Sequence, residues 1–186
     1  MASKADTWRR LHRLFRSPDT AYTQAIGEPE YAHTWTTDRY AIVSHYAASL
    51  PAVEPGAWKL RATQEPLPQP PELAAVPPVR WYEQRLADLD SLAFKPVIVS
   101  PWSWNDSEST LRLIVRDGQI AGWVHDQMMT GWLALPARGD DLRFELSTDS
   151  KVVRVTLIHR SYGTETKQLL GYLMTVRMDG APAFPG

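Results

Sequence analysis

The sequence predicts an α+β fold that is mostly antiparallel β, with two helices and about ten strands. Short segments of alternating apolar and polar residues, typical of strands with one buried face, fill most of the chain from Pro96 onward. Residues 7–16 and 81–92 instead repeat apolar side chains every three or four positions, which is typical of amphipathic helices. Turn-forming residues separate the strands at short intervals, which favours antiparallel neighbours.

The N-terminal half, residues 1–63, is expected to begin with a helix over Thr7–Arg16, capped by Thr7 and ended by the proline-containing stretch 17–19. Strands are expected at Tyr31–Trp35, Tyr40–Tyr46 and Ala57–Arg61. Residues 36–39 form a turn between the first two strands. In this turn the Asp38 carboxylate can accept hydrogen bonds from nearby backbone N–H groups.

Residues 64–79 contain six prolines, so they are expected to form an extended connector. This connector is the best internal boundary of the chain. Residues 80–178 follow as a helix plus a β-rich half, and residues 179–186 form a C-terminal tail.

In the second half a helix is expected at Trp81–Leu92, followed by strands. The strands are expected at Pro96–Val99, Leu111–Val115, Ile120–Val124, Gly131–Leu135, Leu142–Leu146, Val153–Leu157 and Gln168–Met178. The pair Asp117 and Gly118 predicts a tight hairpin, because both residue types tolerate the positive φ of a type I′ turn. The polar segment Ser161–Thr166 is expected to be a loop.

The composition is that of a packed soluble protein, with 44% hydrophobic residues, 22% charged residues and a formal charge of −1. Cysteine is absent, which excludes disulfides and thiolate metal sites and favours a non-oxidising compartment. No apolar run approaches the ~20 residues needed to span a bilayer, and the start of the chain lacks the apolar region of a secretory signal. We therefore expect a cytoplasmic protein.

Motifs for catalysis or metal binding are not found in the sequence. The five histidines form no close metal-ligand pair, and the glycine-rich nucleotide loops and the serine-hydrolase motif do not occur. Two adjacent polar pairs, Asp140 with Asp141 and His125 with Asp126, are expected at the surface, at turns or strand ends. We expect a protein without catalytic residues, metal or cofactor.

Two short segments resemble motifs of DNA sliding clamps, the ring subunits that hold the replicative polymerase of bacteria and phages on DNA. Leu173–Met178 reads Leu-Met-Thr-Val-Arg-Met and is similar to the closing Leu-Met-Pro-Val-Arg-Leu strand of bacterial clamps. Thr36–Ile42 stands where clamps carry a turn reading Ala-Thr-Asp-Gly-His-Arg-Leu. Thr175 replaces the proline of the first motif, and Arg39 replaces the glycine of the second. Together the matches cover about fifteen residues, and they imply a clamp-like fold in a short, divergent member of the family.

The resemblance implies a non-enzymatic processivity or recruitment platform. Clamps surround double-stranded DNA with basic helices that contact phosphates without reading bases. Here the non-specific DNA contacts would come from Arg9, Arg10, Arg13 and Arg16. Peptides of DNA polymerase or of other clamp-binding partners would dock beside the closing strand, at Tyr172, Met174, Val176 and Met178. A closed ring also implies a homo-oligomer.

Two alternatives stay open. Trp102 and Trp104 lie on one strand face and would suit a monomeric binding module that stacks single-stranded nucleic acid or carbohydrate. For the same two tryptophans, packing in a core or at a subunit interface is the favoured interpretation. In the second alternative, the chain is an adaptor or inhibitor that mimics a clamp surface without encircling DNA.

Overall fold

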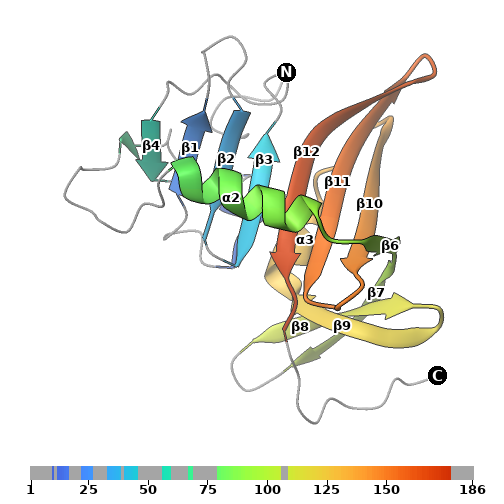
Figure 1. Ribbon diagram of the computed structural model, residues 1–186. Coiled ribbons are helices and arrows are strands. Elements are labelled where there is room, and N and C mark those ends of the chain that lie inside the picture. Colours follow the sequence, from blue (N-terminus) through green and yellow to red (C-terminus); the bar gives the residue numbers. More distant parts are fainter. Residues whose placement is uncertain are drawn as a thin grey trace.

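The computed structural model describes residues 10, 12–16, 22–26, 33–38, 40–45, 56–59, 67–68, 79–105 and 109–176 (Figure 1). Two antiparallel sheets and the helices α2 (Val79–Asp90) and α3 (Asp126–Leu133) organise this part of the chain. The larger sheet has nine strands, in the order β5 (Leu67–Pro68), β4 (Gly56–Lys59), β1 (Tyr22–Ile26), β2 (His33–Thr37), β3 (Ala41–His45), β12 (Thr164–Met174), β11 (Val152–Ser161), β10 (Asp140–Ser147) and β6 (Phe94–Pro96). The smaller sheet consists of β7 (Ile98–Asn105), β8 (Thr110–Arg116) and β9 (Gln119–His125). The predicted α+β class, dominated by antiparallel strands, is confirmed.

Strands β3 and β12 pair at the centre of the large sheet, with Val43 opposite Gly171 and Ala41 opposite Leu173. The two halves of the chain therefore share one sheet, and the proline-rich connector does not separate two independent sheets. Around this pair the order β1-β2-β3-β12-β11-β10 places two three-strand meanders back to back. Helical residues precede each meander: Arg10 and His12 before the first, and α3 before the second.

One face of the large sheet, which we call the core face, is closed by α3, the N-terminal segment 12–16 and the small sheet. Leu14, Phe15 and Trp132 are fully buried there. Two glycines allow this packing. A Cβ atom at Gly171 would overlap the Trp132 ring, and one at Gly131 would overlap the backbone of Arg13.

Helix α2 crosses the opposite face, which we call the α2 face (Figure 1). Leu86 and Leu89 of the helix pack there with Ile42 and Tyr172 of the sheet. The alternation along β12 explains the division, because Leu173 belongs to the core face and Tyr172 to the α2 face.

Helix α3 corrects the expected strand at Gly131–Leu135. The buried positions are Met128, Met129, Gly131 and Trp132, and the three large side chains lie three and four residues apart, which is a helical spacing. Gly131 is required in the helix by the close approach of the Arg13 backbone. The expected loop Ser161–Thr166 is also wrong, because β11 and β12 continue to a two-residue turn at Tyr162 and Gly163, with φ of 49° and 82°.

The predicted hairpin at Asp117 and Gly118 is confirmed, with φ of 53° and 74° between β8 and β9. The expected helix at Trp81–Leu92 is also confirmed, two residues earlier than predicted, as α2. The N-terminal helix is confirmed only in part. Arg10 and His12 are helical, but Arg13 already lies in a turn, and Thr7 to Arg9 fall outside the described residues.

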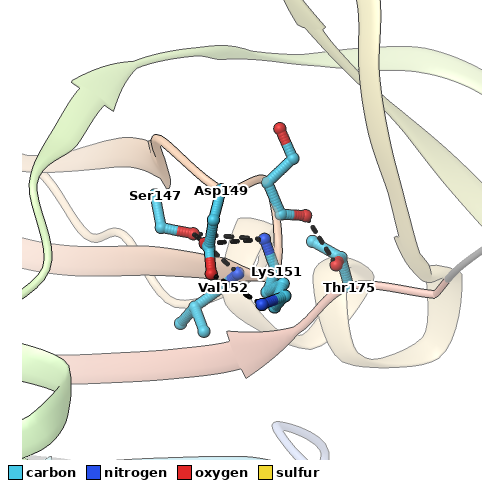
Figure 2. Close-up of polar contacts among 6 residues, drawn as sticks. Ser147, Asp149, Lys151, Val152 and Thr175 are labelled. Carbon is cyan, nitrogen blue, oxygen red and sulfur yellow. Dashed lines mark hydrogen bonds and ion pairs between the residues drawn. The ribbon is translucent and has the colours of Figure 1, made fainter.

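A polar network fixes the end of the closing strand (Figure 2). The Thr175 hydroxyl donates to the Ser150 carbonyl at 2.8 Å, and the Thr175 N–H donates to the Lys151 carbonyl at 2.9 Å. The loop itself is held by Ser147, whose hydroxyl donates to the Asp149 carboxylate at 2.7 Å. A proline at position 175 has no N–H and could not make the bond to Lys151. The threonine that departs from the clamp motif therefore has a structural role here.

Candidate functional site

The turn between β2 and β3 is built as the sequence predicts. One Asp38 carboxylate oxygen accepts hydrogen bonds from the N–H groups of Tyr40 and Ala41, both at 2.9 Å. The Thr37 hydroxyl donates to the Ala41 carbonyl at 2.7 Å. Asp38 itself is 5% exposed, so the turn is part of the packed structure.

The two clamp-like segments lie side by side, although 130 residues separate them in the sequence. Ile42 of the first segment pairs with Tyr172, the neighbour of the second segment, in the β3–β12 ladder. The Met174 N–H donates to the Tyr40 carbonyl at 2.8 Å. The two segments thus adjoin, and their more accessible residues Tyr40 and Met174 form one surface at the junction.

A groove opens where this surface meets α2. Its volume is about 190 Å³, and its lining residues are Tyr40, Ala41, Ile42, Arg85, Leu89, Tyr172 and Met174. The Tyr172 ring is buried, and its hydroxyl donates to the Asp90 carboxylate at the end of α2. Met174 is half-buried. Pockets for drug-sized ligands are typically about 300–1,000 Å³, so this groove suits an apolar side chain that anchors a longer chain.

The structure separates Val176 from this groove. The chain leaves the large sheet after Met174, and the Val176 N–H donates to the Trp123 carbonyl of β9 at 2.7 Å. The Val176 side chain packs against the small sheet, with Leu111 and Leu113. Tyr172 and Met174 are therefore the two predicted groove residues that line the cavity. Met178 lies outside the described residues.

The N-terminal arginines occupy different environments. Arg10 and Arg13 are exposed, whereas Arg16 is half-buried, with its guanidinium carbon 4.6 Å from the centre of the Tyr40 ring. Leu14 and Phe15 anchor the segment in the core. Arg9 lies outside the described residues.

Trp102 and Trp104 pack against Trp123 of the same sheet, with ring centres 5.6 and 6.3 Å away and tilted planes. Both rings remain half-buried, and Val115 and Val176 complete the cluster. The three tryptophans therefore belong to one apolar cluster with leucine and valine side chains, and each predicted platform residue keeps part of its surface accessible.

A second cavity, of about 400 Å³, lies at the start of α3 and was not predicted. Its lining residues are Arg16, Ser109, Thr110, His125, Asp126 and Gln127. The expected surface position of His125 is wrong, since the residue is 8% exposed. Asp126 is partly exposed and forms an ion pair with Arg112. The signal in the sequence that could have indicated this cavity is the adjacent pair His125 and Asp126, which lies where β9 ends and α3 begins.

Burial lowers the pKa of His125 below the ordinary value of 6.5, and the nearby Arg16 guanidinium lowers it further, while Asp38 acts in the opposite direction. The neutral imidazole therefore predominates at neutral pH. A separate Asp–His pair lies on the large sheet, where His159 Nδ1 is 2.7 Å from Asp140 Oδ1 at the start of β10.

Within the described ranges, no group of three or more His, Cys, Asp or Glu side chains is placed to hold a metal ion. Neither described helix combines the length and the apolar character needed to cross a membrane.

No protein-family model, curated protein or solved structure matches this chain at a significant level.

Proposed function

We propose that this protein is a DNA sliding-clamp-like processivity or recruitment platform, which holds duplex DNA non-specifically and docks partner peptides. One observation carries the proposal: the two clamp-like segments, chosen at opposite ends of the sequence, are neighbours in space and line one groove. A shared structural context is the kind of support that short motif matches require.

The groove supports the peptide part of the proposal. Tyr172 and Met174 present a mainly apolar floor, and Arg85 supplies a positive charge among the lining residues. This chemistry favours an extended peptide that inserts an apolar side chain and carries an acidic group near the arginine.

The N-terminal segment, which lies on the core face, supports the proposed contacts with DNA. Arg10 and Arg13 are exposed on the segment that Leu14 and Phe15 anchor beside α3. Exposed arginines on an anchored segment suit contacts with phosphates that carry no sequence information.

The repeated arrangement of helical residues followed by three strands gives further support. A bacterial clamp domain contains two helices and antiparallel strands, and this chain places helical residues before each of its two meanders. A shared architecture alone does not establish function, so the proposal depends on the groove.

Encirclement requires a closed homo-oligomer, so the first test combines mass and topology. Light scattering across a dilution series should give a multiple of the 21.0 kDa chain mass, and the protein should be retained on circular but lost from linearised DNA. A monomer that binds clamp-type peptides would instead be a clamp-mimicking adaptor. A monomer whose tryptophan fluorescence is quenched by single-stranded nucleic acid or carbohydrate would favour the Trp102 and Trp104 module.

The arginine contribution is tested by a salt titration of DNA binding. Each phosphate contact contributes a slope of about 0.9 in a plot of log affinity against log salt. Replacing Arg10 and Arg13 by alanine should therefore reduce the slope by about two. A matched control replaces Lys95 and Arg116, which lie on β6 and at the end of β8. An equal loss in both double variants would contradict the assignment of the DNA surface.

A further inference from the structure

The N-terminus of α3 faces the second cavity without a side-chain cap. His125 is the N-cap residue, with an extended backbone at φ −61° and ψ 125°, and it makes no capping hydrogen bond. The first N–H groups of a helix have no partner within the helix, and the helix dipole makes this end attractive to anions. The Asp126 carboxylate does not occupy this position, because it bonds to Arg112 and to the Thr130 hydroxyl.

His125 is a second and independent indication of a ligand. The side chain is more than nine-tenths buried and lines the cavity. Neither ring nitrogen makes a hydrogen bond to any residue that the structure describes. The ring borders the cavity, so a ligand in the cavity would supply a hydrogen-bond partner for it.

The charges around the cavity favour an anion. Arg112 compensates Asp126 through their ion pair, which leaves the Arg16 guanidinium as the uncompensated charge among the described residues that line the cavity. Asp38 is close enough to act on His125, but Arg16 has the stronger effect on its pKa. Between these two described charges, the positive one therefore dominates at the imidazole.

We propose that this cavity binds a tetrahedral oxyanion, the phosphate group, between the Arg16 guanidinium, the His125 ring and the first-turn N–H groups of α3. The Thr110 hydroxyl at the cavity wall is a further donor. A volume of about 400 Å³ accommodates a phosphate with part of an attached ester. The source is either a backbone phosphate of DNA or a free phosphate compound, and the site does not depend on the proposed clamp function.

Binding must be linked to the protonation of His125. In the unliganded protein, burial and Arg16 hold the pKa of His125 below 6.5. A bound dianion favours the imidazolium, so it raises this pKa, and oxyanion affinity increases as the pH falls. The charged groups that face the imidazole among the described residues are Arg16, Asp38 and the Asp126–Arg112 pair. A pKa increase of one unit corresponds to about tenfold tighter binding to the protonated form.

Sulfate is the probe, because its charge does not change between pH 5 and 8. The expected result, measured by NMR of the histidine ring signals in the full chain, is a saturable shift of His125 and a higher pKa at saturation. Arg16→Gln should weaken sulfate binding about tenfold, whereas Arg116→Gln, a matched charge loss outside the cavity, should leave it unchanged. His125→Gln tests the same site if Arg16→Gln fails to fold.

A short DNA duplex then identifies the source. If the duplex shifts the same His125 signals and displaces sulfate, the ligand is a backbone phosphate. If sulfate saturates the site and the duplex leaves His125 unchanged, the ligand is a free oxyanion. An unsaturable sulfate response, or equal binding by the Arg16 and Arg116 variants, would overturn the proposal.

Discussion

The two faces of the nine-stranded sheet differ in what covers them. The core face is closed by α3, the N-terminal segment and the small sheet, and Trp132 is fully buried at its centre. The α2 face is covered only in part. Beyond α2 it carries a cavity of about 310 Å³, which is lined largely by charged and polar side chains, among them Asp90, Arg143, Glu145, Arg154, Thr156 and Lys167.

The difference separates the residues that hold the fold together from those available to partners. Close packing on the core face leaves no room for a change in side-chain volume. On the α2 face, the groove tolerates truncation because Met174 and Arg85 border open space. Substitutions of the fully buried residues on the core face should therefore change stability, and substitutions around the groove on the α2 face should change peptide binding.

The largest effect is expected for Trp132→Ala. Removing a buried tryptophan leaves a cavity and typically lowers the free energy of unfolding by about 3–5 kcal/mol. Met174→Ala on the α2 face should lower it by about 1 kcal/mol or less, since its side chain is only half-buried. Chemical denaturation measures both. Equal losses would contradict the division between the faces.

Gly171→Ala should cause the next largest loss of stability. The new Cβ would overlap the Trp132 ring, and overpacking of this kind lowers stability by about 1–3 kcal/mol. Gly122→Ala is the matched control, because its Cβ would lie 3.6 Å from Thr175 Cγ2, an ordinary contact. Thermal unfolding of the two variants should differ clearly, and a neutral Gly171→Ala would show that the core face can adjust.

Thr175→Val should have a moderate effect. It preserves the shape of the side chain but removes the bond to the Ser150 carbonyl, at a loss of about 1 kcal/mol. Thr175→Pro should be worse, because it also removes the N–H that donates to Lys151. If urea denaturation finds Thr175→Pro at least as stable as the native chain, the proposed role of the polar network is wrong.

The smallest effect concerns pH and the loop in Figure 2. The Ser147 hydroxyl is the main cause that lowers the pKa of Asp149 below its ordinary value of 3.8, and the Lys151 N–H adds to it. A lowered folded-state pKa means that this stabilisation is complete above pH 4 and is lost as the pH falls through the folded value. The melting temperatures of the native protein and Asp149→Asn should thus converge in acid. A difference that stays constant with pH would contradict the assignment.

Local chemistry made part of the fold predictable. The Asp117–Gly118 turn and the Asp38 turn follow from the conformational preferences and side-chain acceptors of those residues, and both were confirmed. Helix α3 was not predicted, because the expected strand began at Gly131 and left out the buried Met128 and Met129 that complete the helical pattern. Strand β1 was also missed, since its sequence Tyr-Thr-Gln-Ala-Ile shows weak alternation and its strand character depends on pairing with β2 and β4.

The candidate sites were also predictable only in part. The resemblance predicted that Tyr172 and Met174 lie beside a groove, and both residues line the groove next to α2. Val176 was misplaced because a period-two pattern cannot reveal that the chain changes sheets after Met174. The cavity at His125 could not be predicted, because Arg16, Thr110 and His125 meet only through long-range packing.

The most direct test of the central claim is a binding titration with a fluorescent peptide from the clamp-binding segment of a bacterial replicative polymerase. We expect saturable binding that Met174→Ala weakens about tenfold, or about 1.4 kcal/mol. Val176→Ala, two residues away but packed on the small sheet, should bind as the native protein does, with both variants folded by circular dichroism. Absence of saturable binding to the native protein, or equal weakening by the two variants, would contradict the account.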